Sequence, residues 1–261
     1  MTKLMGVVNV TPDSFSDGGL YLDPEAAVAH GGELAAAGAE ILDVGGESTR
    51  PGAEPVAEAE ELARVIPVVS GLAGAGSQVS VDTSKAAVAA AALDAGAEIV
   101  NDVTALRADR DMGPLCAERG ATVVLMHMLG DPQTMQEDPR YDDVVAEVKA
   151  FLVQRLEAAV AAGIDEERVW LDPGIGFGKT AAHNMELLRR LGELRELGRP
   201  LVVGTSRKSF IGKLDGSPAD QRLGGTIASS VLAAAEGADV LRVHDVAEVR
   251  QALTVAAAIL G

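Results

Sequence analysis

The sequence predicts an α/β fold, a single (β/α)8 TIM barrel over residues 1–261, from three observations. Short apolar segments alternate along the chain with segments that carry apolar residues at helical spacing. A recurring unit consists of a helix end, a glycine and an apolar run closing on a polar residue, as in 38–44, 96–102, 120–127 and 237–244. A length of 261 residues accommodates eight such units in one domain.

Eight strands are expected, because segments 4–9 and 79–82 add two and looser copies of the unit end near Asp172 and Gly204. Each leading glycine can stop a helix by adopting positive φ, and strands apolar on both faces suit a parallel sheet covered by helices. The short segment 71–76 is expected to connect a helix to a strand. An open doubly wound sheet shares the local pattern, but it usually has fewer strands, and no dinucleotide fingerprint follows the first strand. Helices are predicted at 24–37, 55–69, 85–95, 112–119, 142–162, 184–197, 221–235 and 245–260.

Composition restricts the kind of partner and compartment. The formal net charge is −17, and a surface this acidic repels nucleic acid and anionic membranes, so neither is an expected partner. No apolar run approaches the roughly 20 residues that span a bilayer, and the N-terminus lacks the layout of a signal peptide. Cys116 is the single cysteine, which favours a packed structural thiol. These features predict a cytoplasmic protein.

Polar side chains end the predicted strands. In a barrel of this type the carboxyl ends of the strands share one rim, where active sites lie. Asn9 ends the first apolar run, and a segment rich in turn formers follows it at 12–19. The candidates at the rim are Asn9, Asp43, Ser48, Thr49, Arg50, Asp82, Asn101, Asp102, His127, Asp172, Lys179, Ser206, Arg207, Lys208, Ser209, Arg242 and His244.

Several of these residues have purely structural explanations. Asn9 can satisfy backbone groups at a strand end, and residues 82–84 (Asp82, Thr83 and Ser84) can cap a helix that begins near Lys85. His127 lies between two methionines, which favours a core histidine with satisfied hydrogen bonds. Residues 183–184 are expected to cap a helix.

Cations gather at the last two predicted strands. Lys208 follows the seventh strand, and Arg242 and His244 end the eighth, where barrels of this type often bind phosphate. Because strand residues alternate, 242 and 244 should share the face that opens onto the site, while Val243 faces the helices. In an acidic protein this cluster predicts a phosphorylated substrate. The alternative is that Arg242 pairs with a nearby carboxylate, Asp239 or Asp245.

The glycine-rich segment 173–180 resembles nucleotide-binding loops only in part. Pro173 occupies the first glycine position of a phosphate loop, and Lys179 occupies the last glycine position of a dinucleotide fingerprint. Both nucleotide motifs are therefore rejected. The glycines are expected to let the backbone approach a flat ligand, with Phe177 as an apolar wall.

Seven segments, in order, resemble the dihydropteroate synthase family across essentially the whole chain: 9–19, 45–52, 81–83, 101–102, 171–174, 206–209 and 242–245. The resemblance implies a pterin-binding barrel that condenses (7,8-dihydropterin-6-yl)methyl diphosphate with 4-aminobenzoate. The products would be 7,8-dihydropteroate and pyrophosphate, in the step of folate biosynthesis that sulfonamides block. It also implies a homodimer.

The resemblance further implies three groups of site residues. The pterin would be held by Asp82, Asn101, Asp172 and Lys208. The diphosphate would be held by Asn9, Arg242 and His244 with Mg²⁺, for which Asn9 is the candidate ligand. The aminobenzoate pocket would be shaped by Phe15, Thr49, Arg50, Pro51, Phe177 and Ser209. The catalytic residues would be Asp82, Lys208, Arg242 and His244.

Two other functions fit parts of the pattern. A pterin-binding methyltransferase domain is also a barrel with Asn and Asp at the pterin, but it would not need Lys208, Arg242 and His244, because its substrate lacks a diphosphate. A catalytically silent paralogue could bind pterin or act as a scaffold. The intact motifs after the first and second strands count against that reading.

Overall fold

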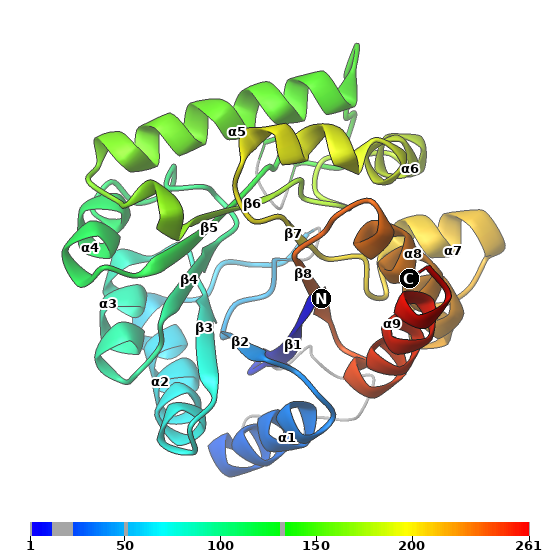
Figure 1. The fold of residues 1–261 in the computed structure, drawn as a ribbon. Coiled ribbons are helices and arrows are strands. Elements are labelled where there is room, and N and C mark those ends of the chain that lie inside the picture. The colour runs from blue at the N-terminus through cyan, green and yellow to red at the C-terminus, as the bar shows by residue number, and fades with distance from the viewer. Residues whose placement is uncertain (1, 12–22, 50–51, 131–133, 261) are drawn as a thin grey trace.

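The computed structural model describes residues 2–11, 23–49, 52–130 and 134–260. Parallel strands form a nearly closed barrel with helices between them, which confirms the predicted fold class (Figure 1). The strands are β1 Lys3–Asn9, β2 Ile41–Gly45, β3 Gln78–Asp82, β4 Ile99–Asp102, β5 Thr122–Met126, β6 Val169–Asp172, β7 Val202–Val203 and β8 Val240–Val243. Their order is β6-β5-β4-β3-β2-β1-β8-β7, and a parallel bridge between Leu171 and Leu201 joins the two ends of the sheet.

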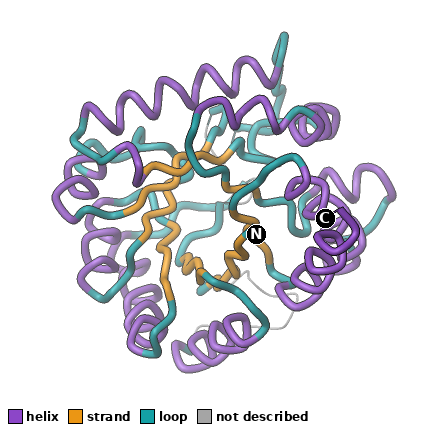
Figure 2. The backbone as a smooth tube through the Cα atoms, in the orientation of Figure 1, coloured by secondary structure: helices purple, strands orange, loops and turns teal. Residues whose placement is uncertain are grey.

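Helices surround the strands on the outside, as the purple and orange segments of Figure 2 show. The α-helices of the described ranges are α1 Pro24–Ala36, α2 Glu58–Gly74, α3 Ala86–Asp94, α4 Met112–Arg119, α5 Val144–Ala161, α6 Ala181–Arg189, α7 Ser209–Asp215, α8 Leu223–Ala235 and α9 Val246–Leu260. In the described part of the chain, no helix combines the length and apolarity needed to cross a membrane.

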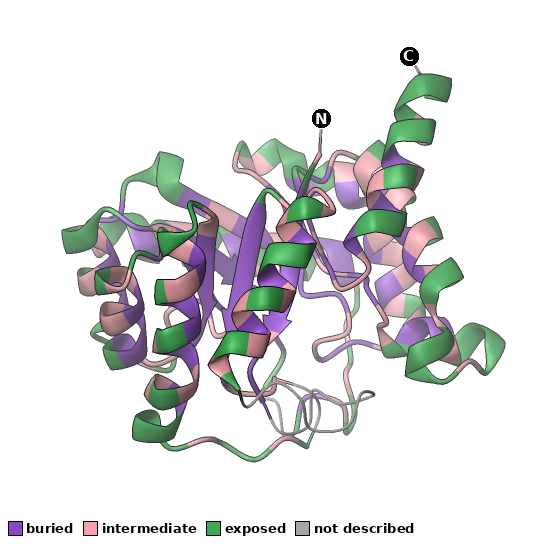
Figure 3. Cartoon of the chain, turned by 90° about the horizontal axis from the view of Figure 1, so that it is seen from below, coloured by how far each residue is buried: buried purple, intermediate pink, exposed green. Residues whose placement is uncertain are grey.

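The core has two layers, because successive strand residues point to opposite faces. Side chains such as Leu4, Val44 and Val81 are buried between the sheet and the helices. Each helix therefore has a buried face toward the sheet and an exposed face toward solvent (Figure 3). On the inner face, a smaller apolar cluster fills the barrel, formed by Met5, Ile41, Ile99, Val124, Val202 and Val240. Cys116 is buried in the outer layer, and burial raises the pKa of its thiol to about 12, so it remains a packed thiol.

Strand register brings the polar strand ends together. Gly45 pairs with Asn9 on one side and with Asp82 on the other, and Asp82 pairs with Asn101. Met126 in turn pairs with Asp172. The polar residues that end β1, β3, β4 and β6 therefore lie at one rim of the barrel.

The structure corrects two predicted helices and adds a third helix. Helix α2 runs on to Gly74, so the predicted connection at 71–76 is wrong; burial of Val69 and Leu72 outweighs the cost of about 1 kcal/mol for each glycine. The predicted helix 184–197 begins earlier and breaks after Arg189, where a 3-10 helix, Leu191–Leu197, follows. Helix α7 was not predicted, because seven residues give too short a periodic pattern.

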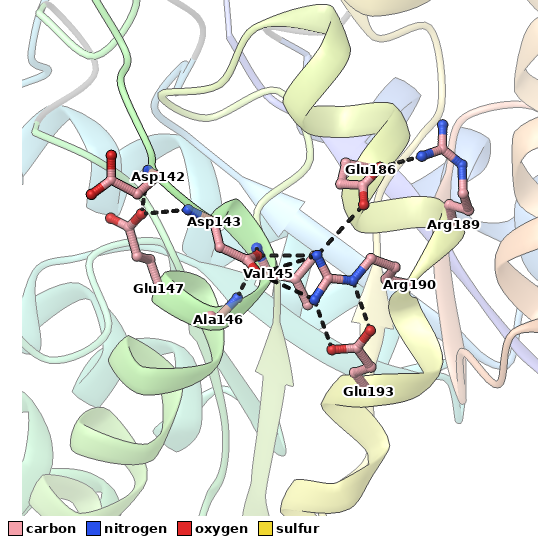
Figure 4. Close-up of polar contacts among 9 residues, drawn as sticks. All are labelled: Asp142, Asp143, Val145, Ala146, Glu147, Glu186, Arg189, Arg190 and Glu193. Carbon is pink, nitrogen blue, oxygen red and sulfur yellow. Dashed lines mark hydrogen bonds and ion pairs between the residues drawn. The ribbon is translucent and has the colours of Figure 1, made fainter.

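Caps and ion pairs set the ends of the helices α5 and α6. Thr180 caps α6 in a capping box with His183, so residue 183 contributes to the cap from inside the helix. At the surface, Arg190 joins the N-cap of α5, Asp143, to Glu186 and Glu193 (Figure 4). Such solvent-exposed pairs contribute about 0–1 kcal/mol each, so they align the two helices more than they stabilise the fold.

The segment after β6 passes very close to the segment after β5. Gly174 has φ +67°, and a Cβ atom there would lie 1.9 Å from the backbone oxygen of His127. Gly178 has φ +61°, and its Cβ would lie 2.6 Å from the Cβ of Leu129. These two glycines therefore allow a close approach that no other residue permits.

Replacing Gly174 should test this close approach. Gly198 has the same φ of +67° but no heavy atom within 4 Å of a built Cβ. We expect Gly198→Ala to lower the free energy of unfolding by about 1–2 kcal/mol through backbone strain alone. Gly174→Ala should lose a further ~1–3 kcal/mol through the clash. Urea unfolding of both variants measures the difference, and equal losses would contradict the packing described.

Candidate active site

A cavity of about 470 Å³ opens at the carboxyl ends of the strands. Its walls come from the strand ends and from the segments that follow β2, β6 and β7. It brings together thirteen of the predicted residues: Asn9, Ser48, Thr49, Asp82, Asn101, Asp172, Phe177, Ser206, Arg207, Lys208, Ser209, Arg242 and His244. The predicted segment 12–19 with Phe15, and the residues Arg50 and Pro51, lie outside the described residues.

Arg242 lies between two carboxylates at the base of the cavity. Its Nε donates to Oδ2 of Asp43 at 2.6 Å, and its Nη2 donates to Oδ2 of Asp82 at 2.9 Å. Asn101 donates from Nδ2 to the same Asp43 oxygen at 3.1 Å. We refer to Asp43, Asp82 and Arg242 as the carboxylate–guanidinium triad. The triad links β2, β3 and β8 across the barrel interior.

The alternative partners considered for Arg242 are wrong. Asp245 instead accepts from Arg207, and Asp239 accepts from the backbone N–H of Leu201 at 2.8 Å. Because Asp43 and Asp82 already neutralise its charge, the burial of Arg242 does not by itself require a bound anion. Val243 is fully buried in the outer apolar layer, as strand alternation predicted.

Burial shapes the ionisation of the triad. It raises the pKa of the Asp82 carboxyl to about 7, although Arg242 lowers it and Asp43 raises it again. Burial would also lower the pKa of Arg242, but Asp43 and Asp82 outweigh that effect and raise it, so the guanidinium stays charged. The Asp82 carboxyl can therefore gain or lose its proton near neutral pH.

Asp172 forms the opposite polar wall. Burial raises the pKa of its carboxyl. Two effects partly oppose burial and lower this pKa: its Oδ1 accepts a hydrogen bond from Gly174 N–H at 2.6 Å, and the positive charge of Lys208 lies nearby. Met126 and Phe177 also line the cavity, so polar groups are set among apolar ones. This combination suits a flat ligand with polar edges.

The segment after β7 is held in a strained conformation. Arg207 has φ +56°, which is uncommon for a residue with a side chain. Its N–H donates to Oγ1 of Thr226 at 2.9 Å, its carbonyl accepts from Arg222 at 3.0 Å, and its side chain pairs with Asp245. The next residue, Lys208, projects into the cavity with Nζ 4.1 Å from the ring centroid of Phe177. Backbone strain of this kind is typical of functional sites.

His244 is oriented by its neighbour on β7. The Ser206 hydroxyl lies 3.0 Å from Nδ1 of His244 and also accepts from the His244 N–H at 3.2 Å. His244 also lines the cavity. The imidazole is therefore fixed in place on the same rim as Lys208 and Arg242.

His127 and Lys179 lie beneath the cavity wall rather than on it. Lys179 Nζ lies 2.8 Å from Nδ1 of His127 and donates to the carbonyls of Gly174 and Phe177, each at 3.0 Å. Burial and the charge of Lys179 lower the pKa of His127, so its ring stays neutral. The prediction of a core histidine with satisfied hydrogen bonds is confirmed.

Several residues contribute to the site without a role predicted from the sequence. Asp43 was noted at a strand end but given no role, although a carboxylate inside an apolar strand was a usable signal. Glu47, Arg222 and Met135 also line the cavity, yet no local pattern marks them. Of the three residues predicted to cap the helix near Lys85, Thr83 accepts from Lys85 N–H before α3, whereas Asp82 pairs with Arg242.

Asp82 should make stability depend on pH. The pKa of the Asp82 carboxyl is about 7 in the folded protein and 3.8 in the unfolded chain. Such a raised pKa stabilises the fold at low pH, and this stabilisation is lost as the pH rises from about 3.8 through about 7. Between pH 4 and pH 7, the free energy of unfolding of the unsubstituted protein should therefore fall more steeply than that of Asp82→Asn. Urea unfolding at several pH values measures both slopes. Parallel curves would show that Asp82 ionises normally.

Comparison with known proteins places this geometry in a family. Residues 5–244 match the family model described as pterin binding enzyme. Dihydropteroate synthase of Escherichia coli K12 is 49% identical over 261 residues, covering 99% of this chain and 92% of that protein.

Solved structures agree with the sequence match. The Yersinia pestis dihydropteroate synthase with a sulfonamide drug complex aligns with a TM-score of 0.96 at 46% identity, covering 99% of this chain and 94% of that one. The Xanthomonas albilineans dihydropteroate synthase in complex with 7,8-dihydropteroate aligns with a TM-score of 0.89 at 49% identity, covering 100% and 94%. Fold, site and sequence thus agree over nearly the whole length, and the chain belongs to the dihydropteroate synthase family of pterin-binding enzymes.

Proposed function

We propose that the cavity holds three adjoining subsites for the reaction of this family, one each for pterin, diphosphate and 4-aminobenzoate. The chain is a transferase of folate biosynthesis. It condenses (7,8-dihydropterin-6-yl)methyl diphosphate with 4-aminobenzoate, giving 7,8-dihydropteroate and pyrophosphate. The division into subsites rests on one observation. A single cavity is lined by Asp82, Asn101, Asp172, Lys208 and His244.

In the proposed pterin subsite, Asp82, Asn101 and Asp172 face the ring and Lys208 lies beside it. A pterin edge presents alternating donors and acceptors, which carboxylate and amide side chains can match. Both carboxyl groups have raised pKa values because they are buried, and pairing them with ring N–H groups would favour their ionised forms. A ligand lacking those donors would leave buried oxygens unpaired, at a cost of about 1–3 kcal/mol each.

The proposed diphosphate subsite contains His244, Arg242 and Asn9. His244 is the residue best placed for it, since Ser206 fixes its ring and Arg242 is committed to two carboxylates. Arg242 can still present its remaining N–H groups to the anion, because a guanidinium has five donors.

Mg²⁺ is proposed to enter with the diphosphate and to contact Asn9. Among the described residues, no group of three or more His, Cys, Asp and Glu side chains is arranged to hold a metal. The amide oxygen of Asn9 on the cavity wall fits an ion held mainly by substrate phosphates and water, as Mg²⁺ usually is. When bound, the ion would neutralise charge on the diphosphate.

The proposed aminobenzoate subsite adjoins Lys208. Thr49, Phe177 and Ser209 line the cavity from the segments after β2, β6 and β7. Ser209 begins helix α7, so its backbone N–H and the helix N-terminus can face a carboxylate. Phe15, Arg50 and Pro51 are proposed for the same pocket on the family resemblance.

The chemistry needs no protein nucleophile. The C–O bond to the diphosphate breaks, pyrophosphate leaves with the bonding electrons, and positive charge develops on the pterin methylene. The amine of 4-aminobenzoate then forms the new C–N bond and loses a proton. Arg242 and His244 would stabilise the leaving anion, and the ionised Asp82 would stabilise the cation. Low polarity around Phe177 would limit capture of the cation by water.

Three broader features are proposed with this function. The chain forms one domain over residues 1–261 and pairs with a second copy, for which the exposed apolar side chains Leu232, Val255 and Ile259 on α8 and α9 offer a surface. A cytoplasmic location is consistent with the only cysteine being a buried free thiol.

Two variants should distinguish the pterin and diphosphate subsites. His244→Ala should weaken binding of the pterin diphosphate and of pyrophosphate about tenfold or more, while a pterin without phosphate binds as before. Lys208→Ala should weaken both pterin ligands and reduce kcat/KM by ~100-fold, taking a lost charged hydrogen bond as about 3 kcal/mol. Calorimetric titration with the three ligands and a pyrophosphate-release assay measure these effects.

The same measurements can refute the assignments. If His244→Ala weakened the phosphate-free pterin equally, the diphosphate would have to lie elsewhere. Near-normal turnover of a folded Lys208→Ala protein would remove Lys208 from the site. Release of pyrophosphate should also depend on added 4-aminobenzoate. A methyltransferase or a silent paralogue would not show this dependence.

A further inference from the structure

A second charged cluster adjoins the cavity and is formed by Glu47, which lines it, with Glu61 and Lys85, which do not. Glu61 on α2 is fully buried, and its Oε2 lies 2.5 Å from Lys85 Nζ. The same ammonium group bonds to Oε2 of Glu47, which belongs to the segment after β2. Lys85 precedes helix α3, so one cation joins three parts of the chain.

The segment that carries Glu47 is also fixed by its neighbours. Arg64 on α2 donates to the carbonyl of Gly46 at 2.8 Å, and Val56 N–H donates to Glu47 at 3.2 Å. A Cβ atom on Gly46 would lie 2.6 Å from a methyl group of Val65, so the backbone sits directly on α2. The two residues after Glu47, which are Ser48 and Thr49, line the main cavity.

Charge balance explains why Lys85 must remain in place. Burial would lower the pKa of Lys85, but its hydrogen bonds to Glu47 and Glu61 outweigh burial and raise it, so the ammonium stays charged. Oε1 of Glu61 has no hydrogen-bond partner among the described residues. Without Lys85, the buried carboxylate of Glu61 would be left without a counter-charge, which would destabilise the fold. Glu61 therefore keeps the Lys85 ammonium group in the position from which it also bonds to Glu47.

We propose that Lys85, anchored by Glu61, is a positioning residue that holds Glu47 and thereby sets Thr49 at the 4-aminobenzoate subsite. This rests on the proposed placement of 4-aminobenzoate beside Thr49. Lys85 does not line the main cavity and touches no proposed ligand. We expect its removal to act mainly on the nucleophilic substrate, because Asp172, Asn101 and Lys208 are held by other contacts.

Steady-state kinetics should separate positioning from simple stabilisation. Lys85→Met and Glu47→Gln should each raise KM for 4-aminobenzoate about tenfold, with KM for the pterin diphosphate changed less than twofold. Lys85→Arg should keep both values near those of the unsubstituted enzyme. Lys149→Met, which breaks a similar pair with Glu196 on the outer surface, is the matched control and should change neither KM.

The double variant Lys85→Met with Glu61→Gln makes the test decisive even if Lys85→Met folds poorly. Removing the buried charge of Glu61 should restore the melting temperature, while KM for 4-aminobenzoate stays raised because Glu47 remains untethered. Recovery of KM together with stability would overturn the proposal and leave Lys85 as a counter-ion only. So would a normal KM in Glu47→Gln.

Thr49→Ala separates this inference from the site assignment on which it rests. A raised KM for 4-aminobenzoate in Thr49→Ala with a normal KM in Glu47→Gln would overturn the positioning role alone. If both variants bound 4-aminobenzoate normally, the aminobenzoate subsite itself would be misplaced.

Discussion

The charge balance among Asp43, Asp82 and Arg242 is the constraint on which the rest of the site depends. Three ionisable groups share the interior of a barrel that also holds a cluster of apolar side chains. Removing one partner from a buried pair costs about 3–5 kcal/mol, since the other charge is left unpaired. The triad therefore fixes the distances between β2, β3 and β8 at the base of the cavity. Asn101 extends it to β4 through its bond to Asp43.

The triad also links stability to function. Burial raises the pKa of Asp82 to about 7, while Arg242 lowers it and Asp43 raises it, so a carboxyl that titrates near neutral pH lies beside the proposed pterin subsite. Above that layer the walls are built differently, by segments that follow the strands and are held through backbone contacts. Gly174 and Arg207 adopt positive φ there, and Lys179 donates hydrogen bonds to the backbone carbonyls of Gly174 and Phe177. A rigid charged base thus supports walls that are shaped by backbone conformation.

Much of the fold and site could be predicted from local sequence. The alternation of apolar runs and helical segments predicted the barrel, and position at or just after a strand end predicted twelve residues of the cavity wall. Asn101 and Asp172 needed no more than that rule, because the carboxyl ends of parallel strands meet at one rim.

The remaining features depend on pairings between distant residues. Arg242 and Asp43 are 199 positions apart, and only strand register shows that they meet. Lys85 and Glu47 are 38 positions apart and belong to different loops, so no periodic pattern marks them. Helix α2 ran through glycines that local propensity would have placed outside a helix, because burial of its apolar face decided the outcome.

Binding of a phosphate-free pterin to Asp43→Asn tests the central claim most directly. Asp43 touches no proposed ligand, so it can act only by holding Asn101 and Arg242 and, through Arg242, Asp82. Asp102→Asn is the matched control, since Asp102 is equally buried but bonds to Thr104 and Leu106 instead of the triad. Calorimetric titration should show pterin affinity reduced about tenfold or more in Asp43→Asn and unchanged in Asp102→Asn. Unchanged affinity in a folded Asp43→Asn protein would contradict the account.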